Sequence, residues 1–244
     1  MPDSSSPLAK TADRVRRIRR RLFEAAGSPR YTPRTALSDL DRKLEPYLGF
    51  RRGFFIEAGA GNGWRQSNTY YLEHGRGWSG LLVEPIPENA NICRQIRPRS
   101  VVRNVALVAP DFGKPTTRVS YAYLMSVVED AMPEEQRRAH VAHGVDVQRL
   151  PGTYEVDVPV ATLTALLDEL RPPRIDFFSL DVEHYELQVL RGLDLERYRP
   201  VYILVEANDR PGVTGHLEAS SYRCVAELTK NDLLYRDGRL PDRR

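Results

Sequence analysis

The segment Gly53-Phe-Phe-Ile-Glu-Ala-Gly-Ala-Gly-Asn-Gly63 constrains the fold of this chain more than any other stretch of its sequence. Its apolar run at 54–56 is typical of a buried parallel strand. The run ends in an acid, Glu57, and glycines follow at positions 59, 61 and 63. Because glycine lets the backbone turn sharply and approach a ligand closely, the pattern predicts a strand that leads into a ligand-binding loop.

The spacing of these glycines separates two classes of cofactor. A dinucleotide-binding loop reads G-x-G-x-x-G, and Trp64 stands where its third glycine would lie. Such a loop also keeps the following helix N-terminus free for a pyrophosphate, whereas the anionic Glu57 favours an ammonium or a sulfonium. S-adenosylmethionine carries both cations and no phosphate. We therefore expect it as the cofactor, although a glycine-rich turn without a ligand also fits this segment taken alone.

A second acid supports the same expectation. The apolar run Gly80-Leu-Leu-Val ends in Glu84, 25 residues after Gly59. An acid at the end of the second strand accepts hydrogen bonds from both hydroxyls of a ribose. NAD and S-adenosylmethionine share that ribose, so only the combination of Glu84 with Glu57 and the missing glycine favours the methyl donor. The residues expected to hold the donor are Glu57, Gly59, Gly61, Ser67, Asn68, Glu84, Asn104 and Asp181.

The composition limits the class of protein. The chain has 244 residues, 41% of them hydrophobic, which is enough for one well-packed α/β domain. No run approaches the roughly 18 apolar residues that cross a bilayer, and the N-terminus lacks the apolar stretch of a signal peptide. The two cysteines, Cys93 and Cys224, fit no metal or redox spacing. We therefore expect a cytoplasmic protein, with Cys224 as a core thiol.

The first 35 residues form a separate unit in this interpretation, a disordered start followed by a basic amphipathic helix, and the methyltransferase domain is expected at 36–244. Six arginines lie between Arg14 and Arg21, although the net charge is only +3. Val15, Ile18 and Leu22 form a narrow apolar stripe on the same helix. The arginines suit an arm for nucleic acid or an acidic membrane. The stripe favours packing on the domain or on a second subunit, and in the second case the chain would form a homodimer; a solvated arm fits as well.

Alternating strands and helices predict a mostly parallel sheet flanked by helices. We expect strands near 53–58, 80–84, 101–107, 175–181 and 201–206, and helices near 37–47, 65–75, 87–97, 162–171 and 185–191. An antiparallel hairpin at 222–228 and 232–235 is expected at the sheet edge. The span 108–160 is too long for a simple connection. With strands at 117–123 and 154–160 and a helix at 133–143, it is a candidate substrate lid or a decoration without function.

Three ordered blocks resemble one family. Residues 53–88, Ile175-Asp-Phe-Phe-Ser-Leu-Asp-Val-Glu-His-Tyr-Glu186 with Val189-Leu-Arg-Gly-Leu193, and Val201-Tyr-Ile-Leu-Val-Glu-Ala-Asn208 are similar to the FkbM family of S-adenosylmethionine-dependent O-methyltransferases. The resemblance covers roughly 50–210. It implies a class I methyltransferase fold with seven strands, and methyl transfer to a hydroxyl of a sugar or a polyketide. The chain also resembles the sugar O-methyltransferases of methylmannose polysaccharide biosynthesis. One departure is plain, since His184 stands where the family usually places glycine.

Polar residues at the expected ends of the fourth and fifth strands suggest the chemistry. Asp181, Glu206 and Asn208 offer the oxygen ligands that suit Mg²⁺ or Mn²⁺, and their layout resembles that of catechol-type O-methyltransferases. Those enzymes place a basic residue three positions after the first metal acid, where this chain has His184. We expect the metal to orient the acceptor and His184 and Asp181 to be catalytic. Without a metal, the acids would form hydrogen bonds to the donor's amino group or to loop amides. His140 and His143 are rival bases.

Other classes of protein remain as alternatives. A nucleic-acid methyltransferase is suggested by the arginine helix, but Asp181-Val-Glu-His184 is unlike the Asp/Asn-Pro-Pro-aromatic pattern of amino-methylating enzymes. An NAD-dependent oxidoreductase and a non-catalytic binding module fit the glycine loop and its acids less well, and a polyketide or lipid hydroxyl is a further acceptor. Three aromatic residues are expected either to line an acceptor groove or to pack within strands: Tyr121, Tyr123 and Tyr154.

Overall fold

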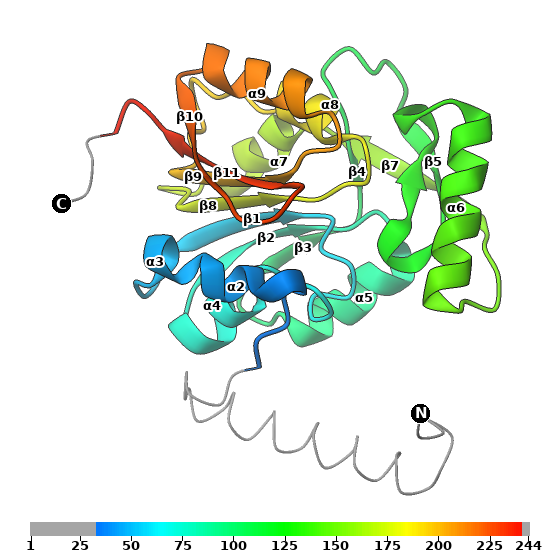
Figure 1. The fold of residues 1–244 in the computed structure, drawn as a ribbon, viewed down its shortest axis with the longest axis horizontal. Helices are drawn as coiled ribbons and strands as arrows, with labels where there is room; N and C mark the ends of the chain where they lie inside the picture. Colours follow the sequence, from blue (N-terminus) through cyan, green and yellow to red (C-terminus); the bar gives the residue numbers. More distant parts are fainter. Residues whose placement is uncertain (1–32, 241–244) are drawn as a thin grey trace, which may run out of the picture.

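A seven-stranded sheet forms the centre of the molecule in the computed structural model, which describes residues 33–240 (Figure 1). The strand order is β10-β11-β9-β8-β1-β2-β3. The bounds are Phe54–Ala58 (β1), Ser79–Val83 (β2), Val101–Arg103 (β3), Phe177–Leu180 (β8), Tyr202–Glu206 (β9), Tyr222–Glu227 (β10) and Asp232–Asp237 (β11). The expected basic helix at Arg14–Arg21 lies outside the described residues.

The directions of the strands confirm the predicted fold class. Strands β3, β2, β1, β8 and β9 run parallel, and β11 pairs antiparallel with both β9 and β10. This arrangement is the Rossmann-like class I methyltransferase fold. The strand order reverses between β1 and β8, so the carboxyl ends of these two strands border the crevice where open α/β sheets bind ligands. The predicted hairpin at the sheet edge is confirmed as β10 and β11.

Helices cover both faces of the sheet because its strands are apolar on both sides (Figure 1). One face packs against α7 (Leu163–Leu170), α8 (Glu186–Arg191) and α9 (Arg210–Ala219). The other packs against α2 (Leu40–Lys43), α3 (Glu45–Leu48), α4 (Tyr70–Arg76) and α5 (Pro87–Ile96), with a short 3₁₀ turn, η1 (Leu37–Asp39), before α2. Within β1, Phe55 belongs to one core and Ile56 to the other, so this central strand joins the two layers.

The insertion after β3 builds a second, smaller sheet beside the first, drawn in green in Figure 1. Its strand order is β4-β7-β5-β6, with bounds Ala106–Leu107 (β4), Thr116–Ser120 (β5), Val127–Val128 (β6) and Glu155–Ala161 (β7). Two 3₁₀ turns, η2 (Tyr123–Met125) and η3 (Glu129–Ala131), and the long helix α6 (Glu134–Gln148) complete it. The predicted strands and helix of this span are present, and α6 is longer than expected.

Three local predictions differ from the structure. The expected strand at 101–107 is two strands in different sheets, because the Asn104 amide donates to the carbonyl oxygens of Glu84 and Pro85 (2.9 and 2.8 Å) and turns the chain between them. The expected helix at 65–75 begins only at Tyr70, since residues 67–69 bind the Glu57 carboxylate. Cys224, expected in the core, is exposed.

Candidate active site

A cavity of about 550 Å³ opens at the carboxyl ends of β1, β2, β8 and β9, under the insertion. Its wall on one side is the glycine loop after β1 together with Glu84. Its wall on the other side carries the acids that follow β8 and β9. Residues 123–126 of the insertion and Gln148 at the end of α6 also line it. The cavity therefore has two chemically different ends and a cover that comes from the insertion.

The glycine loop is fixed by its own backbone. The amides of Gly59 and Ala60 both donate to the carbonyl oxygen of Val83 on the neighbouring strand, each at 3.1 Å. The next amide, that of Gly61, donates to Glu84 Oε2 at 2.8 Å. The loop thus leaves the end of β1 and turns toward the end of β2. Both predicted glycines, Gly59 and Gly61, line the cavity as expected.

Glu84 lies where a ribose acceptor is expected. Its carboxylate accepts the amide of Gly61 on one oxygen and the amide of Ile86 (2.9 Å) on the other, and the side chain is buried. Burial raises its pKa from about 4.5 to about 7, against the effect of these hydrogen bonds. Each oxygen keeps a further lone pair, so the carboxylate can also accept the two hydroxyls of a ribose.

Glu57 does not face the cavity, contrary to the expectation that it meets the donor's cation. Its carboxylate accepts three hydrogen bonds from the segment that follows the glycine loop, from Ser67 Oγ (2.9 Å), the Asn68 amide (2.9 Å) and Thr69 Oγ1 (2.6 Å). Arg97, fully buried, stands behind it with Nη1 3.4 Å from Glu57 Oε2. Glu57 therefore positions the segment 67–69, and this segment is what reaches the cavity.

Two of the residues that Glu57 holds do line the cavity, as predicted for donor binding. Ser67 and Asn68 are both buried in this wall. The side-chain nitrogen of Asn68, Nδ2, donates to Ser179 Oγ at 3.0 Å, while the side-chain oxygen, Oδ1, has no hydrogen-bond partner among residues 33–240. Asn104, the remaining predicted donor contact, is not part of the lining; it holds the backbone of Glu84 and Pro85 instead.

Four carboxyl groups line the opposite end of the cavity: Asp181, Glu183, Glu206 and Asp232. Asp181 is exposed toward the cavity but enclosed by protein elsewhere, and its carboxyl group lies within hydrogen-bonding reach of Glu206. Desolvation, and then the neighbouring Glu206, raises the pKa of Asp181 well above its usual value. Neither of these two acids forms an ion pair within the described part of the chain. They are therefore two neighbouring carboxyl groups, and the neutral form of Asp181 is favoured.

The structure does not bring together the three predicted ligands of Mg²⁺ or Mn²⁺. Asp181 and Glu206 are neighbours in the cavity wall, but Asn208 is exposed and outside the lining. Its side chain hydrogen-bonds to the buried Glu186 instead. The hard-cation site at Asp181, Glu206 and Asn208 thus remains a prediction from the sequence, of which two ligands are placed together.

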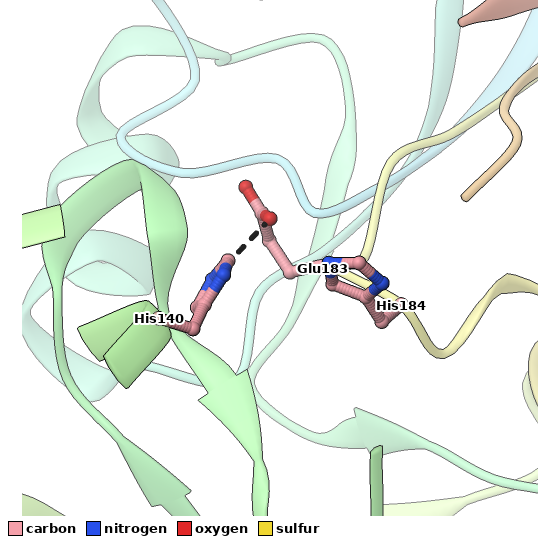
Figure 2. Close-up of side chains that lie close together, drawn as sticks. All are labelled: His140, Glu183 and His184. Atoms are coloured by element: carbon pink, nitrogen blue, oxygen red, sulfur yellow. Dashed lines mark ion pairs between the residues drawn. The ribbon is translucent and has the colours of Figure 1, made fainter. Parts of the chain in front are cut away.

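His184, the predicted base, lies just outside the cavity. Its side chain is exposed and is not part of the lining, whereas the preceding residue, Glu183, is. Figure 2 shows His184 beside Glu183 and His140, the latter reaching across from α6. The Nε2 atom of His140 lies 3.5 Å from Glu183 Oε2. The other rival base, His143, is exposed on α6.

Of the three aromatic candidates, Tyr123 alone lines the cavity. Its hydroxyl accepts a hydrogen bond from Asn62 Nδ2 (3.2 Å), which connects η2 to the glycine loop. The rings of Tyr121 and Tyr154 stack on each other with centroids 4.6 Å apart, on the insertion and outside the lining. Through Tyr123, the insertion therefore contacts the glycine loop directly.

Sequence reasoning missed several lining residues. Asp232 begins β11 and pairs with Glu206, so the antiparallel register brings it to the acidic end. Gln148 reaches the cavity from the last turn of α6, where it also donates to the carbonyl oxygen of Ala122 at 2.7 Å. An acid at the start of the expected hairpin was a usable signal for Asp232. Nothing in the sequence indicates Gln148.

Comparisons with known proteins place the site in context. The methyltransferase FkbM domain matches residues 57–225, and no curated protein matches the sequence. Solved structures with a similar arrangement include a TehB-like SAM-dependent methyltransferase from Corynebacterium glutamicum (10% identity over 94% of this chain and 98% of that chain, TM-score 0.44). Another is a methyltransferase from Geobacter sulfurreducens (10% identity over 97% of this chain and 90% of that chain, TM-score 0.43). A third is an O-methyltransferase from Bacillus cereus in complex with SAH (13% identity over 88% of this chain and 86% of that chain, TM-score 0.42). Among residues 33–240, no helix combines the length and apolar character needed to cross a membrane.

Proposed function

This chain belongs to the FkbM family of methyltransferases and is an S-adenosylmethionine-dependent methyltransferase, and we propose that its acceptor is a hydroxyl of a sugar or oligosaccharide. A mannoside-like ring is the favoured acceptor. The observation that carries the proposal is the division of the cavity into a glycine and Glu84 end, suited to the donor, and an end lined by four carboxyl groups. Carboxylate oxygens accept hydrogen bonds from the several hydroxyls of a sugar.

Each predicted donor-binding residue that lines the cavity has a role in this proposal. Glu84 accepts the ribose hydroxyls, and the glycine loop lets the donor approach the backbone. Ser67 and Asn68, held by Glu57 behind them, stand beside the loop. The unpartnered Oδ1 of Asn68 is an acceptor of the kind that an ammonium group seeks. Asp181 lies where the two ends meet, close to the place where the methyl group is transferred.

The charge of the acceptor end argues against a nucleic-acid substrate. Within residues 33–240, Arg65 is the one lysine or arginine that lines the cavity. Five carboxyl groups line the same cavity, namely the four at the acceptor end and Glu84. Phosphates would be repelled there. A polyketide or lipid hydroxyl would leave most of these carboxyl groups without hydrogen-bond donors, which is costly in a largely buried wall. A neutral acceptor with many hydroxyls satisfies them.

The reaction itself is an in-line displacement at the methyl carbon. The acceptor oxygen forms the new C–O bond, the C–S bond breaks, and the sulfur leaves as S-adenosylhomocysteine. Holding the two reactants in register can supply about 7–11 kcal/mol. An alcohol with a pKa near that of water, about 15.7, is not ionised beforehand, so its proton must leave during the transfer. We propose that a carboxylate oxygen of the neighbouring acids Asp181 and Glu206 takes that proton.

The proposal is tested by supplying a methyl-labelled donor with three acceptors: methyl mannosides and short mannosides, RNA, and a long-chain alcohol. We expect the label in the sugar fraction, where it stays attached under alkaline treatment because a methyl ether, unlike a methyl ester, is stable to base. Transfer to RNA with a steep dependence on salt would replace the proposal by the nucleic-acid alternative. Transfer to the long-chain alcohol alone would replace it by the lipid alternative.

Donor binding should depend on pH through Glu84. Its pKa of about 7 in the free protein lies above the usual 4.5, so the carboxylate becomes protonated as the pH falls below 7 and then no longer accepts both ribose hydroxyls. We expect the affinity for S-adenosylhomocysteine, measured by calorimetry, to be constant above about pH 8 and to fall by up to about tenfold per pH unit below 7.

Glu84→Gln isolates this effect. Because a hydrogen bond to a charged group contributes about 1.5–3 kcal/mol, the variant should bind S-adenosylhomocysteine about 10- to 100-fold more weakly, and its affinity should lose the pH dependence. Glu88→Gln is the matched control, since Glu88 is exposed one turn along and outside the cavity. An unchanged affinity in Glu84→Gln would remove Glu84 from the donor site.

A further inference from the structure

Three side chains from two distant segments meet at the border between the insertion and the main sheet (Figure 2). His140 comes from α6, and Glu183 and His184 follow β8. One potential ligand atom of each lies within 4.8 Å of those of the other two. The rings of His140 and His184 stand edge to face with centroids 5.6 Å apart. Two imidazoles and a carboxyl group in such proximity form the donor set of many metal sites in proteins.

The backbone that carries two of these groups is strained. Glu183 and His184 have φ angles of 50° and 71°, in the left-handed region that residues with a Cβ rarely adopt. Each such conformation costs conformational energy, and strain of this kind concentrates at functional sites. Glycine would adopt φ = 71° without that cost. The strain is explained if the imidazole of His184 has a task that glycine lacks.

We propose that His140, Glu183 and His184 form a binding site for a divalent transition-metal ion, which fastens α6 of the insertion to the loop between β8 and α8. This site is separate from the Mg²⁺ or Mn²⁺ site expected at Asp181, Glu206 and Asn208. It shares no ligand with it.

The distances suit an ion between the ligands better than direct contact. At 3.5 Å, the His140 Nε2 to Glu183 Oε2 separation is long for a hydrogen bond. Two ligand atoms around a tetrahedral Zn²⁺, at about 2.0–2.2 Å from the ion, lie about 3.4 Å apart. A small rotation of the exposed His184 ring would bring its nitrogen into the coordination shell of the ion as the third protein ligand. Imidazole nitrogens select Zn²⁺, Co²⁺ or Ni²⁺ over Mg²⁺, which prefers oxygen ligands.

The charges around the three side chains also favour a cation. Glu183 lies near two further acids, Glu186 and Glu206, and has His140 as its ion-pair partner among the described residues. A divalent ion would offset the charge of these acids, and the two imidazoles would bind it through their nitrogen lone pairs.

The position of the site gives the ion a mechanical consequence. Glu183 lines the cavity, and so does Gln148, the last residue of α6. An ion held by His140 and the β8–α8 loop therefore keeps the insertion closed over the cavity. This consequence for turnover rests on the proposed function, whereas binding of the ion does not.

The test is calorimetric titration of Zn²⁺, and in parallel Mg²⁺, into the full chain prepared without a histidine tag and treated with a chelator. We expect one Zn²⁺ per chain with a dissociation constant in the micromolar range or below, and no binding of Mg²⁺ at this site. His140→Ala and His184→Gly should each weaken Zn²⁺ binding at least tenfold. His184→Gly also relieves the backbone strain, so loss of folding does not explain the result. His143→Ala, an exposed histidine on the same helix, should bind Zn²⁺ as the wild type does.

Hydrogen exchange supplies an independent readout. Zn²⁺ should slow exchange of the α6 amides in the wild type and not in His184→Gly. Absence of Zn²⁺ binding, or equal binding in His140→Ala and His184→Gly, would overturn the inference. S-adenosylhomocysteine is titrated into the same preparations: retained donor binding without Zn²⁺ binding rejects only the metal site, whereas loss of donor binding in the wild type rejects the proposed function.

Discussion

Asp181→Asn should lower kcat for methyl transfer by about 10²- to 10⁴-fold, the range for loss of a general base. An amide cannot take the acceptor's proton, whereas the Asp181 carboxyl group can, because desolvation and the neighbouring Glu206 raise its pKa. Asparagine has nearly the shape of aspartate, so the cavity should remain intact. The measurement is single-turnover methyl transfer with saturating donor and acceptor, together with the dissociation constant of S-adenosylhomocysteine, which should change only a few-fold.

Two further variants show whether the pair acts as a unit. Glu206→Gln should lower kcat by a comparable factor, because its carboxyl group lies within hydrogen-bonding reach of Asp181. Asp232→Asn changes another acid in the same wall that is not part of the pair, and should affect the acceptor's KM more than kcat. If Asp181→Asn keeps its kcat and instead loses affinity for S-adenosylhomocysteine, Asp181 is a donor contact and the base lies elsewhere.

The main sheet was predictable because its signals are local. Each central strand is a short apolar run that ends in a polar residue, and the chain alternates such runs with amphipathic helices. Parallel strands place their carboxyl ends at one edge, so Glu84, Asp181 and Glu206 were expected near one another before any contact was known. The structure confirms that they line one cavity. Helix α9 also has local signals, with Asp209 as its N-cap and Pro211 in the first turn, although it is not among the helices expected from the sequence.

Long-range contacts explain the differences. Glu57 stands in the sequence at the mouth of the glycine loop, but its partner Arg97 is 40 residues away and fully buried. A buried arginine needs acidic partners, here Glu57 and Glu73, and this requirement draws Glu57 away from the cavity. The sequence alone does not show which arginine is buried. In the same way, His140 and Glu183 are close only because the insertion folds back onto the β8–α8 loop.

The tightest part of the site is the crossing of the β1 loop over the end of β8, and Gly59→Ala should disrupt it. Gly59 has φ = 79°, and a Cβ there would lie 1.7 Å from the carbonyl oxygen of Asp181. The oxygen is part of the backbone and a Cβ is fixed directly to the backbone, so one of the two loops must move. Left-handed strain of about 1–2 kcal/mol and overpacking of about 1–3 kcal/mol together predict a loss of about 2–5 kcal/mol in the free energy of unfolding. S-adenosylhomocysteine binding should be lost, because the glycine loop and Asp181 separate.

Gly113→Ala distinguishes this steric clash from the conformational cost of a side chain at positive φ. Gly113 has a similar φ, 74°, but a Cβ there would meet its nearest atom only at 3.8 Å. This variant should therefore lose only the left-handed strain of about 1–2 kcal/mol and bind S-adenosylhomocysteine normally. Denaturant unfolding and calorimetry on both variants supply the comparison. Equal losses of stability, with donor binding kept in Gly59→Ala, would mean that the crossing adapts to a methyl group and that close approach of these backbones is not what shapes the donor site.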